Sequence, residues 1–197
     1  MTNSGAAFFH LARYLVGLDD ADTQTTAKER ECLKRFAFER KRIVEIGVYE
    51  GVATQLLADA MSIDGDLFAI DPFITGRFGI CWGRTIARRQ VAKSRDKSRI
   101  HFIEAFSHDA TSMIEGIFDM IFIDADHSIT GITRDWADWS DRVVKGGIIA
   151  LHDTRIPSHN PNVEHLGSYK YFESHIRHDS RFLIVEQVDS LSILLRN

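Results

Sequence analysis

The sequence predicts an α/β fold in which helices cover both faces of a seven-stranded, mostly parallel sheet that closes with an antiparallel hairpin. The first observation behind this prediction is that short apolar runs alternate with amphipathic segments, which is typical of parallel strands joined by crossover helices. The second is that only residues 188–190 separate the last two apolar runs. Three residues cannot form a crossover, so these two strands must pair as a hairpin.

Two helices are expected before the first strand. In the segment 6–18, apolar residues recur at helical spacing, and polar residues interrupt them too soon for a secretory signal. The segment 26–39 begins with Thr26 and Glu29 at the spacing of a capping box. We expect residues 1–40 to form an N-terminal unit, either a lid over a site or a contact with a second copy of the chain.

The other elements make up a main domain over residues 41–197. Its parallel strands are expected at 42–47, 66–71, 99–105, 118–124 and 146–153. Helices are expected at 52–61, 83–93, 107–115, 130–144 and 165–177. The helix at 130–144 places four apolar residues on one face: Ile132, Trp136, Trp139 and Val143. The hairpin strands are expected at 181–187 and 191–196. Ligands of such open sheets bind at the carboxyl ends of the strands.

The composition is that of an ordinary globular chain. A formal net charge of -4 argues against nucleic acid as the main partner. The two cysteines, Cys32 and Cys81, fit neither a disulfide framework nor a zinc site, so a reducing, cytoplasmic location is expected. No apolar run approaches 18 residues, so we expect no membrane span.

The loop after the first expected strand argues against a nicotinamide cofactor. A dinucleotide fingerprint, GxGxxG, lets a pyrophosphate approach the N-terminus of a helix. Here the pattern is ExGxxxG, from Glu45 through Gly47 to Gly51, and Glu50 within the loop would repel a pyrophosphate. A cofactor with positive charge and no phosphate fits this loop better, and S-adenosylmethionine carries both a sulfonium and an ammonium.

Four stretches together resemble the class I S-adenosylmethionine-dependent methyltransferases: IVEIGVYEGVATQLLADAM, DLFAIDPF, FDMIFIDADHS and GGIIALHDT. The sequence is most similar to small-molecule O-methyltransferases of the caffeoyl-CoA, catechol and macrocin types, over about residues 26–197. The resemblance implies a Rossmann-like fold and methyl transfer to a hydroxyl of a small molecule, such as a sugar or a natural product. An RNA methyltransferase and a non-catalytic scaffold that binds S-adenosylmethionine are the alternatives.

The resemblance also implies a cofactor site. The two glycines would let the backbone approach the methionine half, whose amino group Glu45 would orient. Asp71 would bind both ribose hydroxyls, and Asp124 would face the sulfonium. Phe106 and Ser107 would flank the adenine, although a core position and a helix cap are the alternatives for these two. The full expected set is Glu45, Gly47, Tyr49, Gly51, Asp71, Phe73, Phe106, Ser107 and Asp124.

The chemistry is expected where the fourth and fifth strands end side by side. A hydroxyl nucleophile needs a general base or a metal ion. The metal-dependent O-methyltransferases that the sequence resembles bind Mg²⁺ or a similar ion through an acid after strand four and an Asp-Asn or Asp-Asp pair after strand five. Here the pair is His152-Asp153. The catalytic residues are expected to be His152, Asp124 and His127.

Two alternatives follow for these residues. In one, Asp124, His152 and Asp153 hold a divalent metal, and the imidazole favours zinc, manganese, iron or nickel over magnesium. In the other, which we favour from the sequence, His152 or His127 is a general base and no metal takes part.

Two further segments are candidates for holding the acceptor. Residues 77–99 carry eight basic residues and one acid. A solvated helix face is the ordinary explanation, and a surface for an anionic acceptor or partner is the alternative. The loop 154–167 adds His159 and His165 and is expected to form part of the acceptor pocket, while the loop 72–83 could cover the cofactor.

Overall fold

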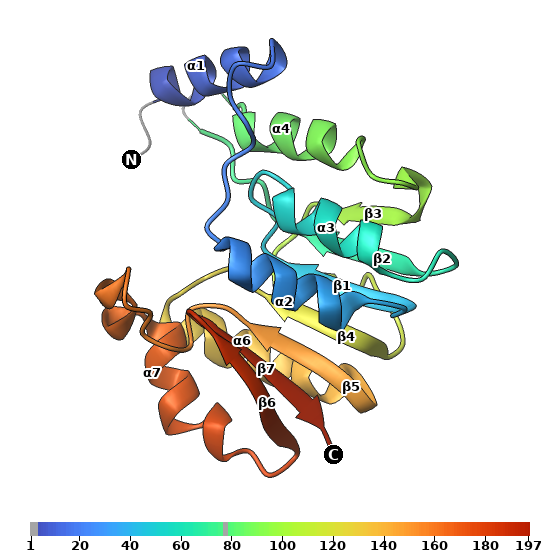
Figure 1. The fold of residues 1–197 in the computed structure, drawn as a ribbon, viewed down its shortest axis with the longest axis vertical. Helices are drawn as coiled ribbons and strands as arrows, with labels where there is room; N and C mark the ends of the chain where they lie inside the picture. Colours follow the sequence, from blue (N-terminus) through green and yellow to red (C-terminus); the bar gives the residue numbers. More distant parts are fainter. Residues whose placement is uncertain (1–3, 77–78) are drawn as a thin grey trace.

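A computed structural model describes residues 4–76 and 79–197 and contains one seven-stranded sheet (Figure 1). The strand order is β3-β2-β1-β4-β5-β7-β6. Neighbouring strands from β3 to β5 pair in parallel, whereas β7 runs antiparallel to both β5 and β6. The strands are β1 (Arg42–Ile46), β2 (Asp66–Ile70), β3 (Ile100–Ile103), β4 (Phe118–Ile123), β5 (Val143–Leu151), β6 (Phe182–Val188) and β7 (Leu191–Arg196). The predicted sheet and its closing hairpin are confirmed.

Helices cover both faces of this sheet. The α-helices of the described residues are α1 (Ser4–Leu15), α2 (Ala27–Ala37), α3 (Val52–Ala60), α4 (Trp82–Val91), α5 (Ser107–Ala110), α6 (Ile129–Trp139) and α7 (Gly167–Ser174). In Figure 1, α2 and α3 lie in front of the sheet, and α6 lies behind it. No helix in the described part of the chain has both the length and the apolar character needed to cross a lipid bilayer.

Three predicted helices are shorter than expected. The helix expected at 165–177 is α-helical only over Gly167–Ser174 and is followed by a 3₁₀ turn at residues 176–178. The segment 107–115 is helical only to Ala110, after which the hydroxyls of Thr111 and Ser112 donate to nearby carbonyl oxygens and the chain turns. The expected helix 130–144 ends at Trp139, because residues 140–142 form a 3₁₀ turn and Val143 already pairs with Phe118 as the start of β5. Apolar spacing alone could not separate the end of the helix from the start of the strand.

The core has two layers, one on each face of the sheet. Alternate residues of β1 show this arrangement, since Ile43 packs in the layer beneath α2 and α3, and Val44 packs in the layer beneath α6. Helix α2 contributes Cys32, Leu33 and Ala37 to the first layer. The segment 27–37 therefore shares a core with the main domain, so the expected boundary at residue 40 does not divide two cores.

The helix α1 lies away from the sheet and packs against α4 (Figure 1). Leu11 and Tyr14 bury themselves against Ile86, and the Tyr14 hydroxyl donates to the Gln90 side chain at 2.8 Å. The chain then returns toward the sheet and enters α2 at Thr26, whose hydroxyl and Glu29 form the predicted capping box. The segment between the two helices thus passes close to the carboxyl ends of the strands.

Candidate active site

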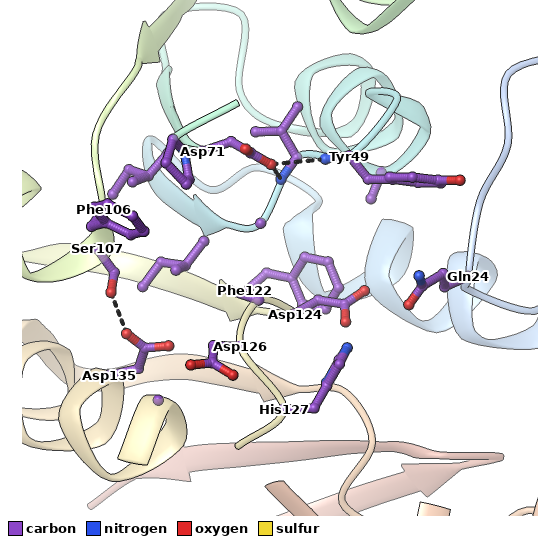
Figure 2. A pocket seen from close by; sticks show the side chains of 18 of the residues that line it. Gln24, Tyr49, Asp71, Phe106, Ser107, Phe122, Asp124, Asp126, His127 and Asp135 are labelled. Atoms are coloured by element: carbon purple, nitrogen blue, oxygen red, sulfur yellow. Dashed lines mark hydrogen bonds between the residues drawn. The ribbon is translucent and has the colours of Figure 1, made fainter. Parts of the chain in front are cut away.

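A cavity of about 850 Å³ opens at the carboxyl ends of β1, β2 and β4 (Figure 2). Its lining includes six aspartates: Asp22, Asp71, Asp109, Asp124, Asp126 and Asp135. Among the described residues of the lining, Arg134 is the single Arg or Lys. Such a wall produces a negative potential, which favours a ligand with positive charge.

Gly47 allows the ends of β1 and β4 to approach each other. Its φ is 95°, and a Cβ at this position would overlap the carbonyl oxygen of Asp124. The second glycine, Gly51, has a φ of 79° and begins α3, where a Cβ would press on the backbone of Ala87 in α4. Gly47 therefore lines the cavity as predicted, whereas Gly51 shapes it from behind through helix packing.

The carboxylate of Asp71 holds the loop that follows β1. It accepts hydrogen bonds from the backbone N–H groups of Val48 at 2.9 Å and Tyr49 at 3.1 Å, and from that of Phe73 at 2.7 Å. A carboxylate offers about four acceptor positions, so one remains for a ligand. Asp71 lines the cavity, and its hydrogen bonds also hold the loop in place. The sequence did not indicate this second role.

The two predicted aromatic residues beside this loop differ in their placement. Tyr49 is half-exposed, lines the cavity and has a φ of 54°. Phe73 instead lies in the core against Phe102, with ring centroids 6.2 Å apart, and is not among the lining residues. Its neighbours Pro72 and Ile74 line the cavity in its place.

Glu45 is fully buried, and neither of its carboxylate oxygens has a hydrogen-bond partner among the described residues. Burial raises the pKa of this carboxyl well above its usual value, and the nearby charges of Asp124 and Asp71 raise it further. The residue directly precedes Ile46, which lines the cavity. An unpartnered buried acid here fits a positively charged ligand group such as an ammonium.

One end of the cavity combines an aromatic ring with a buried acid. The Phe106 ring is half-exposed and stacks on His108 with centroids 5.7 Å apart. The Ser107 hydroxyl donates to the carboxylate of Asp135, and burial raises the pKa of Asp135 to about 6. Asp135 was not predicted as a site residue, although it lies beside Trp136 on the face of α6 that the apolar spacing marks as buried.

His152 and Asp153 are not among the lining residues; His152 is buried among carboxylates beside Asp124, which does line the cavity. Its Nδ1 is 3.3 Å from Asp124 Oδ1 and 3.5 Å from Asp153 Oδ1. Its Nε2 is 3.3 Å from Glu29 Oε2 and 3.1 Å from Ser190 Oγ. Burial alone would lower the pKa of His152, but these carboxylates, Asp124 above all, raise it to about 12.

This environment bears on which histidine can act as a base. With no other cation present, the raised pKa of His152 favours the imidazolium form, which cannot accept a proton. This environment argues against His152 as the base and leaves His127, the other histidine that the sequence offered for that role. His127 is a third exposed, lines the cavity, and places Nδ1 3.4 Å from Asp153 Oδ2. Figure 2 shows the side chains of His127, Asp124 and Gln24 converging on this end of the cavity.

The predicted metal ligands come together as a set. One ligand atom each from Asp124, His152 and Asp153 lies within 4.8 Å of the others. Asp124 Oδ1 and His152 Nδ1 are both buried and have no hydrogen-bond partner among the described residues. One nitrogen and two oxygen donors suit a first-row transition ion better than Mg²⁺, which prefers oxygen donors alone. The residues present thus fit a metal, though not the one that the resemblance implies.

The segment before α2 forms a wall of the cavity that the sequence did not indicate. Residues 22–25 line the cavity, and Glu50 in the loop after β1 holds them there. Its carboxylate accepts from the backbone N–H of Asp22 at 2.6 Å and lies 3.1 Å from His10 Nε2. Glu50, expected as a source of repulsion for pyrophosphate, therefore anchors the N-terminal segment to the loop.

Three of the seven described basic residues in 79–99 form ion pairs on the surface. Arg84 and Arg88 both contact Glu104, at 3.0 and 2.6 Å, and Arg99 lies 3.9 Å from Asp66. No described residue of 79–99 lines the cavity, and Arg77 lies outside the described residues. This arrangement matches the solvated helix face, which was the ordinary explanation.

The loop 154–167 lies beside the cavity and not within it. His165 and Lys170 border a shallow depression of about 540 Å³ that shares Asp126 and His127 with the main cavity. His159 lines neither space. The loop thus reaches the edge of the site, and its expected part in holding an acceptor stays a prediction.

The strand order and the cavity at the carboxyl ends of β1, β2 and β4 define the fold of class I S-adenosylmethionine-dependent methyltransferases. A family model described as a methyltransferase domain matches residues 44–154, more than half of the sequence. The chain therefore belongs to the methyltransferase domain family. No curated protein matches the sequence closely enough to add to this assignment.

Solved structures share the fold at low sequence identity. An O-methyltransferase from Bacillus cereus in complex with SAH is 18% identical, with a TM-score of 0.67 over 100% of this chain and 93% of that one. The SAH-bound methyltransferase PaMTH1 from Podospora anserina is 19% identical, with a TM-score of 0.69 over 98% and 88%. The O-methyltransferase TomG from Streptomyces achromogenes, in complex with SAM, is 18% identical, with a TM-score of 0.65 over 100% and 91%.

Proposed function

We propose that the protein transfers the methyl group of S-adenosylmethionine to a hydroxyl of a small molecule. The observation that carries this proposal is the acidic cavity itself. Its lining includes the Phe106 ring, which suits an adenine, and also the carboxylate of Asp124 and the imidazole of His127. The buried carboxylate of Glu45 has no hydrogen-bond partner among the described residues and suits an ammonium, which supports S-adenosylmethionine as the cofactor. The solved O-methyltransferases with the same fold support the reaction class.

In this proposal the cofactor supplies an electrophilic methyl group, and the protein aligns the acceptor with it. His127 takes the proton of the acceptor hydroxyl at its exposed imidazole. Asp153, 3.4 Å from His127 Nδ1, stabilises the imidazolium that forms. Asp124, which lines the cavity, would favour the positive sulfonium by its charge. A divalent ion held by Asp124, His152 and Asp153 would lower the pKa of the same hydroxyl.

The charge of the cavity bears on the acceptor. The sequence allowed an anionic acceptor, on the basis of the basic residues in 77–99, but those in the described part, 79–99, lie outside the cavity. The cavity walls carry six aspartates, and an anionic group would be repelled there. We therefore propose a neutral or cationic small molecule as the acceptor.

The test is a methyl-transfer screen over hydroxylated small molecules, followed by a base variant. His127→Gln should lower kcat by about 10²–10⁴-fold, the usual contribution of a general base, and leave the affinity for S-adenosylhomocysteine nearly unchanged. His178→Gln, an exposed histidine in a 3₁₀ turn, is the matched control. An unchanged kcat in His127→Gln would remove the base assignment. Cofactor binding with no methyl transfer to any acceptor would favour the scaffold alternative.

A further inference from the structure

The two ring nitrogens of His152 face groups of different kinds. On one side, Nε2 meets the buried carboxylate of Glu29 at 3.3 Å and the hydroxyl of Ser190 at 3.1 Å. On the other side, Nδ1 faces Asp124 and Asp153 at 3.3 and 3.5 Å without making a hydrogen bond to either. Nε2 therefore has hydrogen-bond partners, whereas Nδ1 has none among the described residues.

Glu29 determines which nitrogen carries the proton in the neutral ring. Its carboxylate is 1% exposed and accepts from the N–H and the hydroxyl of Ser190 at 2.8 and 2.7 Å. An ionised carboxylate only accepts hydrogen bonds, so the ring N–H belongs on Nε2. The lone pair of Nδ1 then points at Asp124 and Asp153, which repel it unless a cation stands between them.

The two separations that involve His152 Nδ1 fit such a cation. Ligand atoms bound at about 2.0–2.2 Å around a four-coordinate ion lie roughly 3.3–3.6 Å from one another. The separations of His152 Nδ1 from the two carboxylate oxygens are 3.3 and 3.5 Å. A ring whose other N–H donates to a carboxylate is also the common arrangement of a histidine that binds a metal.

The charge of the cluster points the same way. Three carboxylates, those of Glu29, Asp124 and Asp153, surround the His152 ring, and His127 approaches Asp153 from the cavity side. A proton on Nδ1 supplies one positive charge against three negative ones, and a divalent ion supplies two. Buried carboxylates are stable only when such charges are compensated.

We infer that Glu29 is a positioning residue that presents His152 Nδ1, together with Asp124 and Asp153, to a divalent metal ion. The donors favour a first-row ion such as Mn²⁺, Fe²⁺, Co²⁺ or Zn²⁺ over Mg²⁺. The inference concerns the same site as the proposed function and adds the class of metal to it. It also assigns a role to α2, since Glu29 belongs to the N-terminal segment and lies 123 residues from its partner in the chain.

The test uses the metal-free full chain at pH 8, titrated with Co²⁺ and separately with Mg²⁺ in the absence of cofactor and acceptor. Calorimetry and the Co²⁺ absorption spectrum report binding without any need for activity. Co²⁺ should bind at this site at least about tenfold more tightly than Mg²⁺, because imidazole is a poor magnesium ligand. His152→Asp, which makes all three donors oxygen, should reduce the preference for Co²⁺ over Mg²⁺.

Glu29→Gln should lower the Co²⁺ affinity by about 10–100-fold, the usual effect of losing such a partner, with the same visible spectrum at saturation. Glu31→Gln, an exposed acid in the same helix, is the matched control and should leave the affinity unchanged. All titrations are repeated with His10→Gln, because His10, Asp22 and Glu50 form a second group of ligand atoms within 4.8 Å.

Mg²⁺ binding as tight as that of Co²⁺, or Co²⁺ binding that His152→Asp leaves unchanged, would overturn the inference, as would the absence of any binding. If Glu29→Gln fails to fold, the His152→Asp comparison decides the metal preference, and Glu29→Asp decides the positioning role through a weakened affinity. A titration with S-adenosylhomocysteine on the same preparations separates the two proposals. Cofactor binding without metal binding removes the inference alone.

Discussion

At the scale of single residues, the site is marked by acids that are buried without a cation beside them. Burial raises the pKa of both Glu45 in β1 and Asp135 in α6. Such groups reduce the stability of the folded chain, because a buried charge is costly and a buried neutral carboxyl still needs partners. They are therefore expected where a ligand completes their contacts.

The first prediction concerns Glu45. Because burial raises the pKa of Glu45 and disfavours its charged form in the free protein, Glu45→Gln should change the free energy of unfolding by less than about 1 kcal/mol. The same variant should weaken S-adenosylhomocysteine binding by about tenfold or more, since hydrogen bonds to charged groups contribute roughly 1.5–3 kcal/mol. Calorimetric titration and urea unfolding measure the two effects. Equal affinity in wild type and variant would show that Glu45 does not meet the cofactor.

The second prediction concerns Asp135 and pH. Its folded pKa of about 6 lies above its ordinary value of 3.8, so the stability associated with its proton is complete below pH 3.8 and is lost as the pH rises through about 6. Asn cannot titrate, so Asp135→Asn should gain in stability relative to wild type by up to roughly 3 kcal/mol between pH 4 and pH 7.5. Urea unfolding at both pH values tests this, and parallel pH profiles would contradict it.

At the scale of elements, the site depends on how closely strand ends approach. The backbone N–H of Asp124 donates to the Ile46 carbonyl at 2.8 Å, and that of His152 donates to the Ile123 carbonyl at 3.1 Å. These two contacts extend the ladders beyond β1, β4 and β5 and set Asp124 beside His152. Gly47 makes the first contact possible, because it has no side chain to obstruct Asp124.

The third prediction follows from that glycine. Gly47→Ala should destabilise the protein by roughly 2–5 kcal/mol, which combines the cost of a positive φ with overlap against a backbone carbonyl. Gly146→Ala is the matched control, because Gly146 has a φ of 74° but a Cβ there meets nothing within 4 Å. It should cost only about 1–2 kcal/mol. Thermal or urea unfolding measures both, and equal losses would show that the overlap is relieved.

The sequence was sufficient for the elements and insufficient for some of the contacts. Alternation of apolar runs predicted every strand and the closing hairpin, because burial in a sheet imposes that pattern directly. The resemblance placed Phe73 in the cofactor site, whereas Glu29 was predicted only as part of a capping box and not as a neighbour of His152, 123 residues away in the chain. Nothing local in the sequence specifies which helix covers which strand end, so such contacts become visible only in the fold.

At the scale of the whole molecule, the N-terminal segment and the sheet enclose the site together. Helix α1 packs on α4, residues 22–25 form a wall of the cavity, and Glu29 reaches the buried cluster at His152. The sequence predicted residues 1–40 as a lid or as a contact for a second copy. The described part of this segment reaches the cavity at residues 22–25, and both the lid and the contact with a second copy stay predictions.

The most direct test of the central claim is calorimetric titration of the full chain with S-adenosylhomocysteine. The account predicts one site per chain. It also predicts that Asp71→Ala lowers the affinity by at least about tenfold, because this variant releases the loop after β1 and removes a carboxylate that faces the ligand. Asp64→Ala, an exposed acid paired with Lys41 away from the cavity, should bind as the wild type does. Absence of binding heat in the wild type over a range of temperatures would contradict the account.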